Sequence, residues 1–111
     1  DNIVNTILRE DSLLSARLRE KNLSFDDIAL LDNPSVIRII RETDPVEIEK
    51  ALRTADYRVR EKIMNNLSSE VSEKVRNNEG RPILIADIEA AQNRITGLLK
   101  KLMEQGEIAF A

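Results

Sequence analysis

Apolar residues recur at helical spacing along nearly the whole chain, and no segment alternates as a β-strand does. Val59, Ile63 and Leu67 lie four positions apart, so they fall on one face of an α-helix. The last periodic segment carries a longer stripe, made of Ile88, Ala91, Ile95, Leu98, Leu99 and Leu102. This periodicity predicts an all-α fold.

Proline and glycine mark where these helices start and stop. Asn33-Pro34 and Asp44-Pro45 are each typical of an N-cap followed by the first helical residue, and Gly106 is placed as a C-cap. Gly97 falls inside a helical pattern. There it either allows another backbone to approach closely or destabilises the helix by about 1 kcal/mol relative to Ala. We expect helices over residues 2–9, 12–21, 25–31, 34–42, 45–54, 57–67, 69–78 and 86–105. They predict a compact bundle or an armadillo-like stack with the last helix as its spine.

A polar segment separates the first two expected helices from the rest. Two helices alone cannot build a core, so residues 1–21 are expected to be the tail of a preceding armadillo-like repeat and residues 26–111 a separate domain. A hinge is then expected at 22–25, which comprises Asn22, Leu23, Ser24 and Phe25. A tight turn between two helices of one domain is the alternative. Because the chain begins with Asp1 rather than Met, we expect it to be a fragment of a longer protein.

The apolar side of residues 1–21 has no partner helices within the fragment. We expect it to pack on a second copy of the chain, as a dimer or by domain exchange at 22–25.

The residues that the chain lacks exclude several kinds of chemistry. It has no Cys and no His, which excludes thiol nucleophiles, histidine acid–base catalysis and zinc sites built on these ligands. The carboxylate pairs Asp26-Asp27 and Glu70/Glu73 each open an expected helix, where they interact favourably with the helix dipole. We therefore expect no enzymatic activity, no cofactor and no bound metal.

The charge balance argues against nucleic acid as a partner. The chain has 17 basic and 20 acidic side chains, for a net charge of −3, whereas phosphates favour a basic surface. The pair Lys100-Lys101 is the main local exception, and the three aromatic residues offer no stacking platform. The longest apolar runs, such as 83–86, fall far short of the ~20 residues of a membrane span. A protein-interaction or structural module remains.

An ordered set of short motifs runs from Phe25 to the end of the chain. In order they are Phe25-Asp26-Asp27, Leu31-Asp32-Asn33, Arg41-Glu42, Ala51-Leu52-Arg53, Arg60-Glu61-Lys62, Asn66-Leu67-Ser68, Asp87-Ile88-Glu89, Ala91-Gln92 and Gly106-Glu107-Ile108. This set resembles the C-terminal domain of FliG, the rotor or switch protein of the bacterial flagellar motor. The resemblance covers about residues 9–111 and implies six helices after residue 25, an armadillo-like tail before it, and a hinge of which this chain keeps only Phe25.

The resemblance also implies partners and a location. They are FliM and neighbouring FliG subunits, on the cytoplasmic side of the inner membrane at the flagellar basal body. A loop of a MotA-type stator faces a ridge of charged side chains in this family.

Most of that ridge is altered in this chain. Arg53 keeps the first basic position, while the altered positions are Glu70, Asn77, Asn78 and Leu84. Four of the five family charges are therefore absent or reversed, which should abolish the usual complementarity unless the stator changed too. Glu73 and Arg76 lie on the same expected helix and are candidate substitute charges. Arg53 is either a stator-facing charge or an ordinary solvated residue.

Three functions remain open at this point. The first is a rotor domain that has lost most of its stator-facing ridge. The second is an accessory FliG paralogue that assists flagellar assembly without transmitting torque. The third is a general helical adaptor with no flagellar role.

Overall fold

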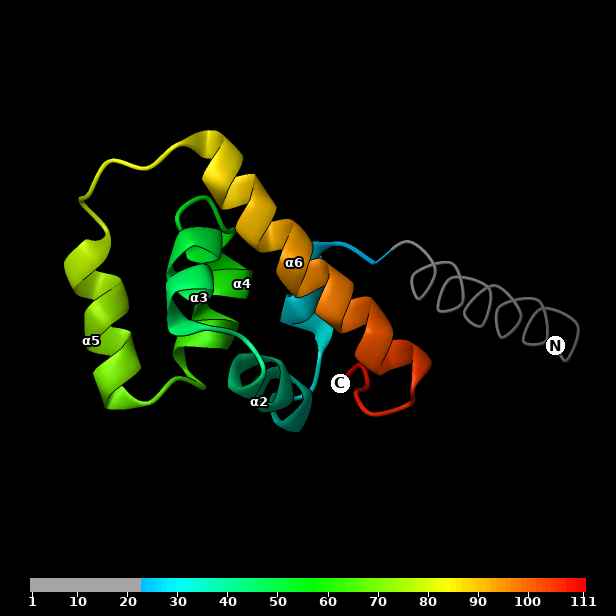
Figure 1. Cartoon of the computed structure of the whole chain (residues 1–111). Helices are drawn as coiled ribbons and strands as arrows, with labels where there is room; N and C mark the ends of the chain where they lie inside the picture. The colour runs from blue at the N-terminus through cyan, green and yellow to red at the C-terminus, as the bar shows by residue number, and fades with distance from the viewer. Residues whose placement is uncertain (1–22) are drawn as a thin grey trace, which may run out of the picture.

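The computed structural model describes residues 23–111, which form six helical segments joined by short connections (Figure 1). In chain order they are η1 (Phe25–Leu30), α2 (Asn33–Arg41), α3 (Pro45–Leu52), α4 (Tyr57–Met64), α5 (Ser69–Asn78) and α6 (Ile85–Glu104). The predicted all-α fold is confirmed. The expected tail 1–21 and residue Asn22 of the expected hinge lie outside the described residues.

Short polar side chains determine where the α-helices begin. N-cap oxygens of Asp32, Asp44, Asp56 and Ser68 accept hydrogen bonds from first-turn N–H groups of α2, α3, α4 and α5. The prediction that Asn33 caps α2 is wrong, because Asp32 accepts from the Ser35 N–H at 2.9 Å. Pro34 then lies at the second helical position, where its missing N–H leaves no bond unmade.

The segment expected as a helix over 25–31 is a short 3₁₀-helix rather than an α-helix. At its start the Ser24 N–H donates to Asp27 Oδ2 at 2.8 Å. At its end Leu31 is extended and pairs with Phe110 in an isolated antiparallel bridge. The chain therefore leaves the helix at Leu31 to make this pairing, after a short run of the tight i→i+3 turns that 3₁₀-helices use.

Helix α6 forms the spine for part of the bundle. It packs on α3, η1 and α2, and its buried residues are Ile88, Ala91, Ile95, Leu99 and Leu102. The predicted spine is thus confirmed for three neighbours, whereas α4 packs mainly on η1 and α2, and α5 mainly on α3. Figure 1 shows α5 at the edge of the bundle beside α3.

The end of α6 turns back over the bundle at Gly106. This residue has φ +69°, the left-handed conformation that ends many helices. Its N–H donates to the Met103 carbonyl and the Glu107 N–H donates to the Leu102 carbonyl. The C-cap itself is Gln105, so the C-cap predicted at Gly106 is wrong by one position, although Gly106 supplies the left-handed turn that ends the helix. Ile108 beyond it returns to the core.

Candidate functional site

Helix α5 presents one side to the core and the other to solvent. Val75 is buried, and Val71 packs partly buried beside it. The exposed residues, which we call the α5 surface, are Ser69, Glu70, Glu73, Lys74, Arg76 and Asn77. Four of the expected ridge or substitute positions therefore share one accessible side of a helix, namely Glu70, Glu73, Arg76 and Asn77.

Acidic and basic groups are separated along the α5 surface. Glu70 and Glu73 come first, and Lys74 and Arg76 follow, which suits the helix dipole. The Lys74 Nζ lies 3.9 Å from Glu70 Oε1, a long and exposed pair. Within residues 23–111, Glu73 and Arg76 form no ion pair. Their charges are therefore accessible to a partner.

The two asparagines at the end of α5 point in different directions. Asn77 is exposed, whereas Asn78 is half-buried. The Asn78 Nδ2 donates to Glu49 Oε2 at 3.1 Å, so its carboxamide contacts α3. Only Asn77 of this pair belongs to the α5 surface.

Arg53 lies at the C-cap of α3 and is half-buried. Its guanidinium donates to the carbonyl of Asn78 at 3.1 Å and also to the carbonyl of Arg81. The side chain thus reaches across to the end of α5 and the loop that follows. Its expected role toward a stator remains a prediction. Its hydrogen bonds connect the end of α3 to the end of α5 and the following loop.

The end of the loop after α5 and the first residue of α6 expose apolar side chains. Leu84 is 70% exposed and Ile85 is 69% exposed, and Leu84 is an N-cap without a side-chain cap bond. Pro82, Ile83, Leu84 and Asp87 line a shallow pocket there. At Leu84, where the resemblance leads us to expect the loss of a basic residue, the structure thus has an exposed apolar side chain.

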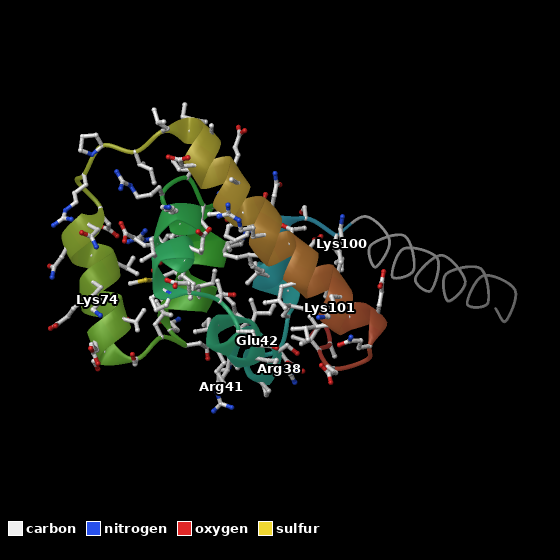
Figure 2. The ribbon with its side chains drawn as sticks, in the orientation of Figure 1. Arg38, Arg41, Glu42, Lys74, Lys100 and Lys101 are labelled. Atoms are coloured by element: carbon white, nitrogen blue, oxygen red, sulfur yellow. The ribbon has the colours of Figure 1, made fainter. Side chains whose placement is uncertain are left out.

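A groove of about 250 Å³ lies between α3 and α5. It is lined by Asp44, Pro45, Val46, Glu49, Lys74, Val75 and Asn78. Lys74 belongs to both this groove and the α5 surface, and Figure 2 shows it on α5. Val46 is 53% exposed, so the groove offers apolar as well as charged contacts.

The described part of the expected hinge is anchored in the core. Leu23 and Phe25 are both buried, while Ser24 between them is exposed. Within the described residues, the structure therefore places Leu23 and Phe25 in the core of the domain that follows, and the hinge expected at 22–25 remains a prediction.

Sequence reasoning missed several residues that hold α5 in place. Glu49 precedes Arg53 by four positions on an expected helix, so the sequence alone could have placed the two residues on the same side of that helix. The ion pair between Arg60 and Glu79 had no comparable signal, since 19 positions separate the two and only the fold brings them together.

Two shifted pKa values belong to α2, away from α5. The pKa of Asp32 lies below its ordinary value because the Ser35 side chain and then its backbone N–H interact with the carboxylate. The pKa of Arg38 is raised, first by its hydrogen bond to Glu42 and then by the charge of Glu107. Figure 2 shows Arg38 and Arg41 on α2, and Glu42 at its C-cap.

The described residues give no positive sign of catalysis. Between residues 23 and 111, no group of three or more His, Cys, Asp or Glu side chains could hold a metal ion. In the same range, no helix combines the length and apolar character needed to cross a bilayer. An all-α bundle that exposes a charged helix and an apolar loop is typical of helical protein-interaction domains.

Comparison with known proteins identifies the family within that class. The family model described as the FliG C-terminal domain matches residues 5–110. The chain is 36% identical to the flagellar motor switch protein FliG of Borreliella burgdorferi, covering 98% of this chain and 32% of that protein. It is 31% identical to the protein of the same name from Bacillus subtilis, covering 98% of this chain and 33% of that protein. The chain belongs to the FliG C-terminal domain family.

Solved structures agree with this assignment. FliG residues 116–343 from H. pylori superpose with a TM-score of 0.73 at 28% identity, over 96% of this chain and 48% of that one. Full-length FliG from Aquifex aeolicus gives a TM-score of 0.71 at 28% identity, over 94% of this chain and 33% of that one. The chain spans about a third of the length of the curated relatives it matches.

Proposed function

We propose that this chain is the C-terminal part of a flagellar motor switch protein and acts in the rotor through protein–protein contacts. The observation that carries the proposal is the family match over residues 5–110, together with the TM-scores of 0.73 and 0.71 to solved FliG chains. Nothing in the fold or the comparisons favours the alternative of a general adaptor.

The proposal includes partners and a location. FliM and neighbouring FliG subunits are the expected partners in the rotor, on the cytoplasmic side of the inner membrane at the basal body. We assign these contacts to the part of the parent protein that includes residues 1–21. Residues 1–21 lie outside the described residues, so this assignment rests on family membership.

We assign any stator contact to the α5 surface and the apolar loop after it. Exposed ion pairs are each worth only about 0–1 kcal/mol, so complementary sign and position over several residues decide such a contact. Glu73 and Arg76 are exposed and unpaired within residues 23–111, and they are the best substitutes for the lost ridge charges. Leu84 and Ile85 would add an apolar contact.

Complementation tests the proposal directly. The full-length parent is expressed in cells lacking their own FliG, and filament assembly and rotation are scored separately. We expect filaments to form, because the fold is retained. Absence of filaments together with absence of affinity for FliM would contradict the proposal.

Charge-reversal variants then test the surface. Glu73→Lys and Arg76→Glu should reduce rotation without reducing filament number. Lys100→Glu is the matched control, since Lys100 is exposed on α6 and lies away from α5 (Figure 2). Filaments that form but never rotate, even with the unaltered parent, would instead indicate an accessory paralogue.

A further inference from the structure

The end of α5 is held by three side chains, which make four polar contacts. Arg53, the C-cap of α3, donates to the carbonyls of Asn78 and Arg81. Glu49 on α3 accepts from the Asn78 side chain at 3.1 Å. The fourth contact is the ion pair between Arg60 of α4 and Glu79. We call this set the α5 clasp.

The apolar attachment of α5 is small by comparison. Val75 is the one residue of α5 that is fully buried, and Val71 adds a partly buried contact. Helix α6, in contrast, buries five residues. The position of α5 therefore depends on polar contacts more than the position of α6 does.

The α3 end of the clasp is itself firmly placed. Gln92 of α6 donates through Nε2 to the Ala51 carbonyl at 2.9 Å and to Thr54 Oγ1 at 3.1 Å. Ala51 and Leu52 are buried. Arg53 thus extends from a backbone segment that is hydrogen-bonded to α6. Its guanidinium in turn links that segment to the end of α5 and the loop after it.

We propose that Arg53 is a positioning residue that sets the orientation of the α5 surface. This deepens the proposed function, on which its relevance to a partner rests. The guanidinium fork places two donors on two carbonyls at once, Asn78 and Arg81, in a way that a lysine ammonium on a flexible stem does not reproduce. A lysine would keep the charge at this position but lose the paired geometry.

The substitution Arg53→Lys distinguishes a role in positioning α5 from a role as a surface charge. If Arg53 positions α5, amide exchange at residues 79–81 in the full chain should accelerate about fivefold to tenfold, since the Arg81 N–H that donates to Asn78 belongs to the held turn. If Arg53 serves as a charge, Arg53→Lys should leave that exchange unchanged, which would overturn the proposal. Arg58→Lys is the control, because the Arg58 side chain is 83% exposed.

A distance measurement between spin labels on α5 and α6 tests the orientation of α5 directly. The chain contains no Cys, so Glu73→Cys on α5 and Asn93→Cys on α6 give two clean, exposed spin-label sites. We expect Arg53→Lys to broaden the distance distribution between the labels, while exchange at buried Leu99 stays as in the parent chain. Equal acceleration of exchange at Leu99 and at 79–81 would show a general loss of stability and overturn the positioning role. Arg53→Gln is the second variant, which keeps one neutral donor.

The same variants can be followed in cells. In the full-length parent, Arg53→Lys should lower rotation speed while filament number stays constant. Failure of the unaltered parent to support rotation or assembly would count against the proposed function alone, because the exchange and distance results do not depend on it.

Discussion

The hydroxyl oxygen of Ser35 accepts a hydrogen bond from the backbone N–H of Ala109 at 2.9 Å, across 74 positions of sequence. Ser35 is 5% exposed and is the one buried polar residue of the core between residues 23 and 111. Two backbone bonds support the same contact, from Asp32 N–H to the Ala109 carbonyl and from Ala111 N–H to the Leu30 carbonyl. The C-terminal segment is thereby fastened to the start of α2.

Ser35→Ala should lower the free energy of unfolding by about 1–2 kcal/mol, because it leaves the Ala109 N–H without its partner. Urea unfolding followed by circular dichroism measures this. Ser69→Ala is the control, since Ser69 is exposed on α5 and its change should stay within about 0.5 kcal/mol. Equal effects of the two changes would argue that the Ser35 bond contributes nothing.

Substitution by Ala at Gly97 and at Gly106 should change the free energy of unfolding in opposite directions. An added Cβ meets nothing within 4 Å at either position, so the backbone alone decides the result. Gly97 lies inside α6, where Ala should raise the free energy of unfolding by about 0.5–1 kcal/mol. Gly106 has φ +69°, where Ala should lower it by about 1–2 kcal/mol. Thermal unfolding of both variants tests this, and a destabilising Gly97→Ala would contradict it.

Most helices could be predicted because their signals are local. The bounds expected for α5, 69–78, match the structure, since Ser68 caps the helix and valines follow at helical spacing. Long-range pairing has no such signal. The bridge between Leu31 and Phe110 joins residues from opposite ends of the domain, and it directly follows the first segment, which is a 3₁₀-helix.

In the candidate site, too, local features could be predicted from the sequence and long-range contacts could not. Exposure of Glu73 and Arg76 follows from their place away from the core-facing stripe of Val71 and Val75, which periodicity reveals. The direction of the Arg53 side chain does not follow from periodicity, because its acceptors are the backbone carbonyls of Asn78, at the end of α5, and of Arg81, in the loop after it. The family resemblance therefore led to an expected role for Arg53, which remains a prediction, and did not indicate the carbonyls that Arg53 contacts.

Leu99 and Leu84 separate core packing from surface function. Leu99 is fully buried, so Leu99→Ala should lower the free energy of unfolding by about 2–5 kcal/mol. Leu84 is 70% exposed, and Leu84→Ala should change it by less than about 0.5 kcal/mol. Chemical unfolding measures both. If Leu84→Ala destabilises as strongly as Leu99→Ala, the loop after α5 is not free to serve a partner.

Asp32 provides a test by pH. Its pKa is lowered from an ordinary value of 3.8 because the Ser35 side chain and backbone N–H interact with the ionised carboxylate. The stabilisation is therefore fully present above the unfolded pKa and is lost as pH falls through the lower folded pKa. Asp32→Asn keeps a good N-cap without the charge.

The melting temperatures of the parent chain and Asp32→Asn should thus differ most above the ordinary pKa of 3.8 and converge as the pH falls through the lowered pKa of the folded state. The parent should be the more stable at neutral pH, because the ionised carboxylate is the form that the Ser35 groups favour. Thermal unfolding across this range measures the difference. A gap that is independent of pH would mean that Asp32 stabilises α2 only as an uncharged cap, and a gap that widens in acid would reverse the sign of the linkage.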